Sequence, residues 1–237
     1  MPIEVSPIIS GMINLLFIAG SCASIAMVIR KWLRGQPLAP FTIRDALDIG
    51  GVFSLLRRLT ARTRGEETDS PPINRPSVRQ FLSDVRLGIF GFLVSFLPMI
   101  LIHLYCQLFV PYEHAAITAI KSDPSASVFF AWAVATVVQT PILEELIFRN
   151  LLQGVLEVYE RMILGPTRKW IFGAAPICIS SLAFAMMHWD QGAAAIPLFL
   201  FALVLGYLFY QTHRLTPPIV AHAALNLFTM INLWFMR

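Results

Sequence analysis

The chain has 237 residues, of which 57% are hydrophobic and only 14% are charged, and its formal net charge is +4. Soluble proteins have about a quarter of their residues charged, so this composition excludes an ordinary soluble domain and favours a protein embedded in a membrane. Eleven of the 18 Lys and Arg residues lie between residues 30 and 86. No nucleic-acid-binding motif accompanies them, so we expect the lipid bilayer, and no nucleic acid, as a partner.

Long apolar runs follow one another along the chain. A transmembrane helix needs about 20 mostly apolar residues. A stretch from Val128 to about Tyr159 is long enough to span but carries charges, and Pro141 inside it could end or kink a helix. We therefore predict an all-α, polytopic transmembrane bundle of about six spans, or seven if Pro141 splits this stretch. The other five predicted spans are Ile8–Ile29, Leu87–Val110, Trp170–Met187, Ala193–Tyr210 and Ile219–Met236.

The segment between the first two runs is basic and polar. Its middle part, residues 42–58, is typical of a surface amphipathic helix, and residues 63–76 are typical of a flexible linker. Because basic residues concentrate on the cytoplasmic side of membranes, we predict that this segment is cytoplasmic. Fifteen of the 18 basic residues then lie inside.

This topology places the N-terminus outside, and we expect a bacterial inner (plasma) membrane. We divide the chain into residues 1–86, an N-terminal transmembrane helix with a basic cytoplasmic connector, and residues 87–237, a membrane-embedded core. Ser77 and Gln80 have the spacing of a capping box, which predicts that the helix of the second span begins there.

The stretch Glu144-Glu145-Leu-Ile-Phe-Arg149 places three charges where lipid would be expected. Each charge costs about 2.5–3.5 kcal/mol at the middle of a membrane helix on insertion scales. Glu145 and Arg149 are four residues apart and can pair on a helix. Glu144 has no equally good partner in its own segment, so we expect it to face the interior of the bundle. A carboxylate in such a place suits general acid/base chemistry.

Two later apolar runs supply possible partners for Glu144. His188 follows Phe184 by four residues, and His222 and Asn226 share one helix face. Imidazole and carboxamide groups can donate hydrogen bonds to a developing oxyanion. Each residue alone has a structural alternative, because membrane helices also use His, Asn and ion pairs to hold a bundle together. Their joint occurrence on three separate segments favours a hydrolytic site.

These motifs resemble those of the CPBP intramembrane proteases, also called the Abi or type II CAAX prenyl endopeptidase family. The matching residues are Glu144-Glu145-x-x-x-Arg149, Phe184-x-x-x-His188 and His222-x-x-x-Asn226. The resemblance implies a membrane-embedded peptidase that acts on a membrane-bound or lipidated peptide or protein. It implies that Glu144 is the general base, that His188 helps to activate water, and that His222 and Asn226 stabilise the oxyanion. Glu145 and Arg149 would support the site.

The residues do not decide whether the protein uses a metal cofactor. Glu144, His188 and His222 could bind a divalent metal such as zinc, and a glutamate-activated water without metal fits the same residues. No HExxH motif is present. The three cysteines show no metal-site or disulfide spacing, and we expect them to be buried thiols; they are Cys22, Cys106 and Cys178.

Two other classes of function compete with a peptidase. The chain could be a non-catalytic membrane scaffold or a bacteriocin-immunity protein, although a scaffold has no need of Glu144. It could also be an ion-coupled transporter, because intramembrane Glu and His form relays, although the sequence has no inverted repeat. The catalytic hypothesis has one geometric difficulty. Full-length spans would separate His188 and His222 in depth by roughly 20 Å, so they can meet only through tilts, partial spans or a re-entrant turn such as residues 189–192.

Overall fold

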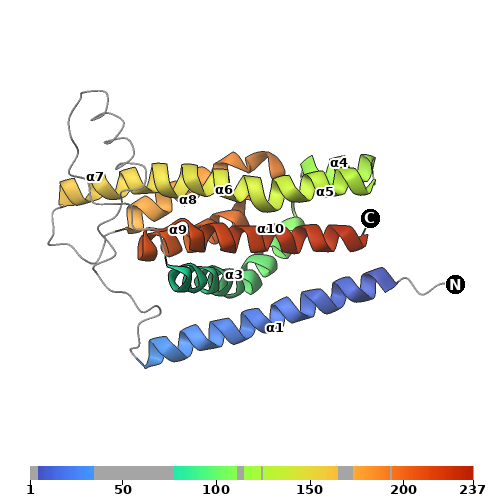
Figure 1. Cartoon of the computed structure of the whole chain (residues 1–237), viewed down its shortest axis with the longest axis horizontal. Coiled ribbons are helices and arrows are strands. Elements are labelled where there is room, and N and C mark those ends of the chain that lie inside the picture. Colours follow the sequence, from blue (N-terminus) through green and yellow to red (C-terminus); the bar gives the residue numbers. More distant parts are fainter. Residues whose placement is uncertain are drawn as a thin grey trace.

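The structure is a computed structural model, and it describes residues 5–34, 77–110, 115–123, 125–164, 173–192 and 194–236. These residues form the predicted all-α, polytopic bundle (Figure 1). The predicted amphipathic helix at 42–58 and the linker at 63–76 lie outside the described residues. The division of the chain at residue 86 stays a prediction.

Five of the described helices are long and apolar enough to cross a membrane. Helix α8 (Ala174–Met187) has only 14 residues, which is about 21 Å and less than the roughly 30 Å of a bilayer's hydrocarbon core. The prediction of a full-length span at Trp170–Met187 is therefore wrong, because α8 crosses only part of the membrane. Four of the five spans are α1 (Val5–Leu33), α3 (Val78–Gln107), α9 (Ala195–Thr212) and α10 (Thr216–Met236).

The fifth span is a composite helix that runs through Pro141 without splitting, so a seventh span does not form. The π-helical turn η2 ends two residues before the proline, and the Thr140 N–H bonds to the carbonyl of Ala135, five residues back. Proline has no N–H to donate to the hydrogen bonds of the helix backbone. Single π-helical turns inside α-helices are common near functional sites. The composite helix comprises α5 (Ala126–Val134), η2 (Ala135–Gln139), α6 (Thr140–Glu145), η3 (Leu146–Gln153) and α7 (Gly154–Leu164).

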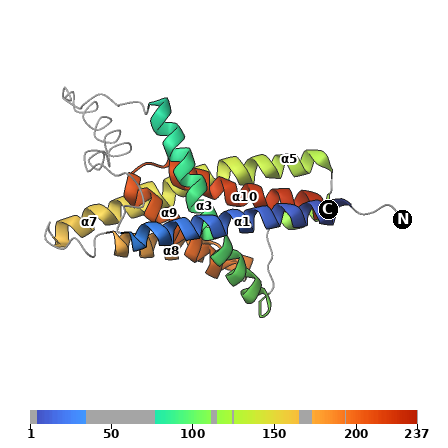
Figure 2. The same ribbon diagram turned by 90° about the horizontal axis from the view of Figure 1, so that it is seen from below.

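The bundle has two ends, which Figure 1 shows on opposite sides. At the connector end lie the end of α1 at Leu33, the end of α7 at Leu164 and the start of α10 at Thr216. At the far end lie the start of α1, the end of α10 and the short helix α4 (Ala115–Ser122). Figure 2 shows that α3 crosses α1 and α10 at a steep angle.

Helices α8 and α9 pack against each other as a hairpin. The turn between them contains the 3₁₀ turn η4 (Trp189–Gln191) and Gly192, whose φ of 64° lies in the region that glycine adopts without strain. The re-entrant turn predicted at residues 189–192 is therefore present.

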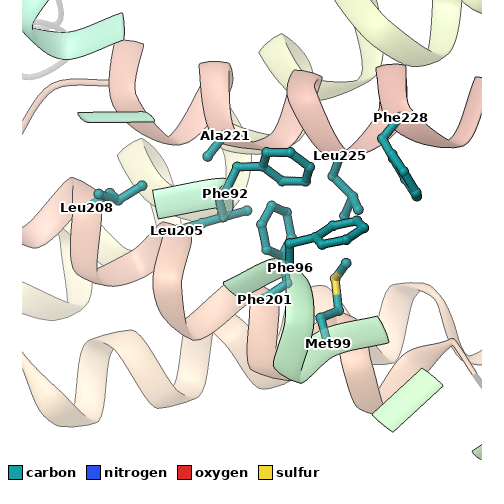
Figure 3. Close-up of a cluster of buried hydrophobic side chains, with 9 residues drawn as sticks. All are labelled: Phe92, Phe96, Met99, Phe201, Leu205, Leu208, Ala221, Leu225 and Phe228. Carbon is teal, nitrogen blue, oxygen red and sulfur yellow. The ribbon is translucent and has the colours of Figure 1, made fainter. Parts of the chain in front are cut away.

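A cluster of large apolar side chains joins α3, α9 and α10 (Figure 3). Phe92 and Phe96 from α3 meet with their rings 5.5 Å apart in an edge-to-face arrangement, a geometry that aromatic pairs prefer. Helix α1 joins through Phe17, whose ring lies 4.9 Å from that of Phe228. The other residues of the cluster are Met99, Phe201, Leu205, Leu208, Ala221 and Leu225.

Polar contacts fix the connector end of α3. The Ser77 side chain accepts a hydrogen bond from the Gln80 N–H at 3.2 Å, which confirms the predicted helix start. One turn further, buried Asp84 accepts two hydrogen bonds from Arg214, at 2.8 and 2.6 Å. This bidentate pair joins α3 to the connection between α9 and α10.

The expectation of buried cysteines is wrong. Cys22 and Cys178 are exposed on the protein surface, and Cys106 is half-buried. All three lie in helices whose outer faces carry exposed apolar residues. Lipid is as apolar as a protein core, so a thiol in a membrane protein gains little by turning inward.

We predict that Gly88→Ala destabilises the bundle. A methyl group at Gly88 would lie 2.6 Å from the carbonyl oxygen of Pro217 and 2.8 Å from the Val220 Cβ on α10. Overpacking of this kind costs about 1–3 kcal/mol, which thermal unfolding of the protein in detergent would detect. Gly11→Ala is the matched control because nothing lies within 4 Å of its added methyl group. Equal stability of the two variants would refute the close packing of α3 on α10.

Candidate active site

Glu145 and Arg149 form the buried centre of the site. The Arg149 Nε lies 3.0 Å from Glu145 Oε2, and both side chains are fully buried. The other Glu145 oxygen lies 2.9 Å from the Nδ1 of His222 on α10. Arg149 Nη1 donates to the Ser180 hydroxyl on α8 at 3.1 Å. The predicted pair therefore forms, and it connects three segments of the bundle.

Glu144 faces the interior, as expected, and lies between the two histidines. One of its oxygens is 3.8 Å from the Nε2 of His188, and the other is 3.8 Å from the Nε2 of His222. Its side chain is 22% exposed. These distances are longer than hydrogen bonds, so both imidazoles face the carboxylate without bonding to it directly.

The depth difficulty disappears because α8 is a partial span. His188 directly follows its last residue, Met187. His222 is six residues into α10, about 9 Å from its connector end. The short α8 lets the two imidazoles reach the same carboxylate, which full-length spans would not allow.

Hydrogen bonds at Nδ1 orient both rings. His188 Nδ1 lies 2.8 Å from the carbonyl oxygen of Phe184, which can only accept, so this nitrogen carries the proton. His222 Nδ1 bonds to Glu145, which Arg149 holds as a carboxylate acceptor. The nitrogen that faces Glu144 is therefore Nε2 in both cases, and a backbone or carboxylate partner at the opposite nitrogen fixes which tautomer is present.

Asn226 lies one turn beyond His222 and is half-buried. Its Nδ2 donates to the carbonyl oxygen of Thr136 at 2.8 Å, in the π-helical turn η2. The contact holds α10 against the composite helix, which is the structural role that an intramembrane Asn often has. One N–H of the carboxamide remains for another acceptor.

A cavity of about 290 Å³ opens beside Glu144. Glu144, His188, His222 and Asn226 all line it, whereas Glu145 and Arg149 do not. The structure thus separates the predicted residues into four that contact the cavity and two that lie behind it. His103, on α3, also lines the cavity. Sequence reasoning assigned it a structural or interfacial place, because a lone imidazole in an apolar run has no spacing that predicts a site.

A second set of buried polar groups continues from Arg149 towards the connector end. The Ser180 hydroxyl lies 3.3 Å from Gln153 Oε1, and Gln153 Nε2 donates to Glu157 and to the Gly206 carbonyl, both at 2.9 Å. Sequence reasoning missed these residues. The signal was present, because positions 145, 149, 153 and 157 are each four apart and so lie on one face of the helix.

The candidate donor groups are not arranged as a metal site in the structure. Within the described part of the chain, no group of three or more His, Cys, Asp or Glu side chains is placed to hold one. Glu144 and the two imidazole Nε2 atoms come closest to such a group, with 3.8 Å between the carboxylate and each imidazole nitrogen. We therefore derive no chemical step through a metal.

Comparison with known proteins agrees with the motifs. Residues 126–228 match the family model described as type II CAAX prenyl endopeptidase Rce1-like. This part of the chain is similar to the Rce1-like CAAX proteases. The match includes all three motifs and begins earlier than the motifs themselves, at the first residue of α5. No curated protein and no solved structure matches the chain.

This similarity and the apolar helices together support an integral membrane protein that resembles membrane peptidases of the CAAX-protease type. Within residues 126–228 the composite helix contributes Glu144, Glu145 and Arg149, the end of α8 contributes His188, and α10 contributes His222 and Asn226. The family match thus falls on the part of the chain in which the polar residues converge.

We predict that Arg149→Met lowers the free energy of unfolding by about 3–5 kcal/mol, because it leaves the fully buried Glu145 without its cationic partner. The double variant Glu145→Gln, Arg149→Met removes both charges, so its free energy of unfolding should fall by less. Arg79→Met, at an exposed position on α3, is the control and should leave stability unchanged. Unfolding in mixed detergent micelles measures all three. An Arg149→Met variant as stable as the control would show that the pair does not hold the site together.

Proposed function

We propose that the protein is an intramembrane endopeptidase that hydrolyses peptide bonds of a membrane-associated or lipidated substrate. The observation that carries this proposal is Glu144, whose two oxygens each face the Nε2 of one histidine at 3.8 Å beside a cavity. A carboxylate and two oriented imidazoles at the edge of a cavity are the groups that water activation needs. The similarity of residues 126–228 to the Rce1-like CAAX proteases also supports peptide-bond hydrolysis.

In the proposed mechanism, Glu144 is the general base and His188 orients the attacking water. The 3.8 Å between Glu144 and His188 Nε2 leaves the carboxylate free to bond a water that the imidazole nitrogen also contacts. As the water oxygen adds to the peptide carbonyl carbon, its proton passes to Glu144. Collapse of the tetrahedral intermediate breaks the C–N bond, and Glu144 returns the proton to the leaving amine.

We assign oxyanion stabilisation to His222 and Asn226, which line the cavity one helical turn apart. With its Nδ1 proton donated to Glu145, His222 can donate from Nε2 only as an imidazolium. The carboxylate of Glu144 would balance that charge before the water attacks, and the oxyanion would balance it once Glu144 has taken the proton. The second N–H of the Asn226 amide is the other donor. Glu145 and Arg149 lie outside the cavity and act as positioning residues, since Glu145 holds the His222 ring in place.

The reaction requires the substrate to present an extended segment at the site. A peptide carbonyl inside an α-helix is hydrogen-bonded to the N–H four residues further along and is covered by side chains. A membrane-anchored substrate would therefore have to present an unwound segment to Glu144.

We further propose a bacterial inner membrane as the location, with the basic connector cytoplasmic and the N-terminus outside.

We predict that Glu144→Gln lowers peptide hydrolysis by about 10²–10⁴-fold, the usual contribution of a general base. The assay uses the purified protein in liposomes with a panel of lipidated and membrane-anchored peptides. Asp123→Asn is the matched control, since its carboxylate is exposed in the connection between α4 and α5 and its activity should equal that of the wild type.

Two outcomes would contradict the proposal. Equal cleavage by the wild type and the Glu144→Gln variant would remove this residue from the mechanism. No cleavage of the whole panel by either protein would favour the non-catalytic alternative, a membrane scaffold or immunity protein. A proton-dependent ion flux into liposomes that Glu144→Gln abolishes would instead favour a transporter.

We also predict that a chelator leaves peptidase activity intact, because the mechanism routes no step through a metal. The purified protein is dialysed against EDTA, its metal content is measured by atomic emission, and hydrolysis is compared before and after. Activity that falls with metal content and returns on addition of zinc would overturn the metal-free mechanism while leaving Glu144, His188 and His222 as the site.

A further inference from the structure

Pro141 leaves one backbone carbonyl of the composite helix without a partner in the helix backbone. The Thr140 N–H bonds to the carbonyl of Ala135, five residues back, in the pattern of the π-helical turn η2. The next carbonyl, that of Thr136, would be bonded in the same pattern by the N–H of residue 141. Proline has no N–H, and Thr140 has already donated its own. The Thr136 carbonyl therefore needs a donor from outside the helix.

Asn226 supplies that donor from the neighbouring helix. Helix α10 runs alongside the composite helix (Figure 1) and contacts η2. The Asn226 Nδ2 lies 2.8 Å from the Thr136 carbonyl oxygen, which satisfies a backbone group that would be costly to leave unpaired at membrane depth. Both residues line the cavity beside Glu144. The interruption that Pro141 makes in the helix hydrogen bonds thus coincides with a residue of the proposed oxyanion site.

The bond to Thr136 decides which way round the Asn226 carboxamide lies. A carboxamide oxygen only accepts hydrogen bonds, whereas the NH₂ group donates two. The Thr136 carbonyl also only accepts, so it selects the orientation in which Nδ2 faces η2. One N–H is then bonded, and the second is available to an oxyanion. In the flipped carboxamide, the side-chain oxygen would take the place of Nδ2 and repel both the carbonyl and the oxyanion.

We propose that Pro141 is a positioning residue of the reaction, because the N–H that it lacks leaves the Thr136 carbonyl free to hold Asn226 as a donor. The inference rests on the proposed peptidase function and adds a residue that no part of the mechanism has used. Pro141 is fully buried and does not line the cavity, so it acts through Thr136 and Asn226 and does not touch the substrate. Donors fixed in advance are what stabilisation of an oxyanion requires.

Any amino acid other than proline at position 141 brings an N–H into the helix. If the π-helical pattern continues, that N–H bonds to the Thr136 carbonyl. If the segment changes to a regular α-helix, in which each N–H bonds four residues back, the Thr140 N–H bonds to it. In both cases the backbone takes the acceptor that orients Asn226.

A double-mutant cycle between Pro141→Ala and Asn226→Ala tests the proposal with the liposome assay. We expect Pro141→Ala to lower kcat by about 10–100-fold at an unchanged KM, less than the roughly 10²–10³-fold that loss of a whole oxyanion donor costs. In the Asn226→Ala background, Pro141→Ala should cause no further loss, since residues that act as a unit are not additive. Losses that multiply would show that Pro141 only supports the fold, and would overturn the proposal.

Two further variants separate the missing N–H from other effects of proline. Pro98→Ala is the matched control, because Pro98 also lies inside a membrane-spanning helix, α3, but does not line the cavity; its activity should equal that of the wild type. Pro141→lactic acid has the side chain of alanine and an ester oxygen in place of the N–H, so it should restore the kcat that Pro141→Ala loses. A lactic acid variant as slow as Pro141→Ala would assign the effect to the proline ring and overturn the proposal.

The side-chain NMR signals of Asn226 test the same link without a substrate. In protein with isotope-labelled asparagine in detergent micelles, the NH₂ pair of Asn226 is the pair that Asn226→Ala removes. We expect Pro141→Ala to move this pair and to speed its exchange with water, and Pro98→Ala to leave it unchanged. An unmoved pair in Pro141→Ala would overturn the proposal. A wild type that cleaves no peptide would contradict the peptidase function instead, so the two can fail separately.

Discussion

The structure depends on one constraint, which is that charges inside a membrane must be paired. Glu145 satisfies it with two partners at once, since one oxygen binds Arg149 and the other binds His222. The pairing joins the composite helix to α10, and Arg149 extends it to Ser180 on α8. Removing one partner of such a buried pair costs far more free energy than the intact pair contributes to stability. The three segments that carry the site are therefore held together by the same contacts that make their charges tolerable.

With Glu145 and Arg149 fixed, Glu144 is the charge that remains available for chemistry. It is next to Glu145 in the chain, so the same helix turn presents one carboxylate to the buried pair and the other to the cavity. The two histidines follow the same division, since each is held at Nδ1 and presents Nε2 to Glu144. This arrangement preorganises the groups that would act on a peptide bond, which is the general requirement for electrostatic catalysis.

The bundle is divided at Glu144 into two unlike halves. Towards the connector end, a ladder of buried polar side chains spaced four residues apart fills the interior. Towards the far end, a cavity lies between the helices, with the π-helical turn η2 along one wall. The filled half supplies rigidity to the reacting groups, and the open half supplies access. A site at the boundary between them can be both well ordered and reachable.

The sequence by itself determined that the protein is a helical membrane bundle, because apolar runs of about 20 residues have no other stable form in lipid. It also indicated which polar residues to group into one candidate site, since Glu144, Arg149, His188, His222 and Asn226 are each costly in lipid and occur together on three separate segments. Only the tertiary structure decided how they meet. The length of α8, the continuity of the helix through Pro141 and the direction of the cavity depend on packing between distant segments, and no local pattern encodes such packing.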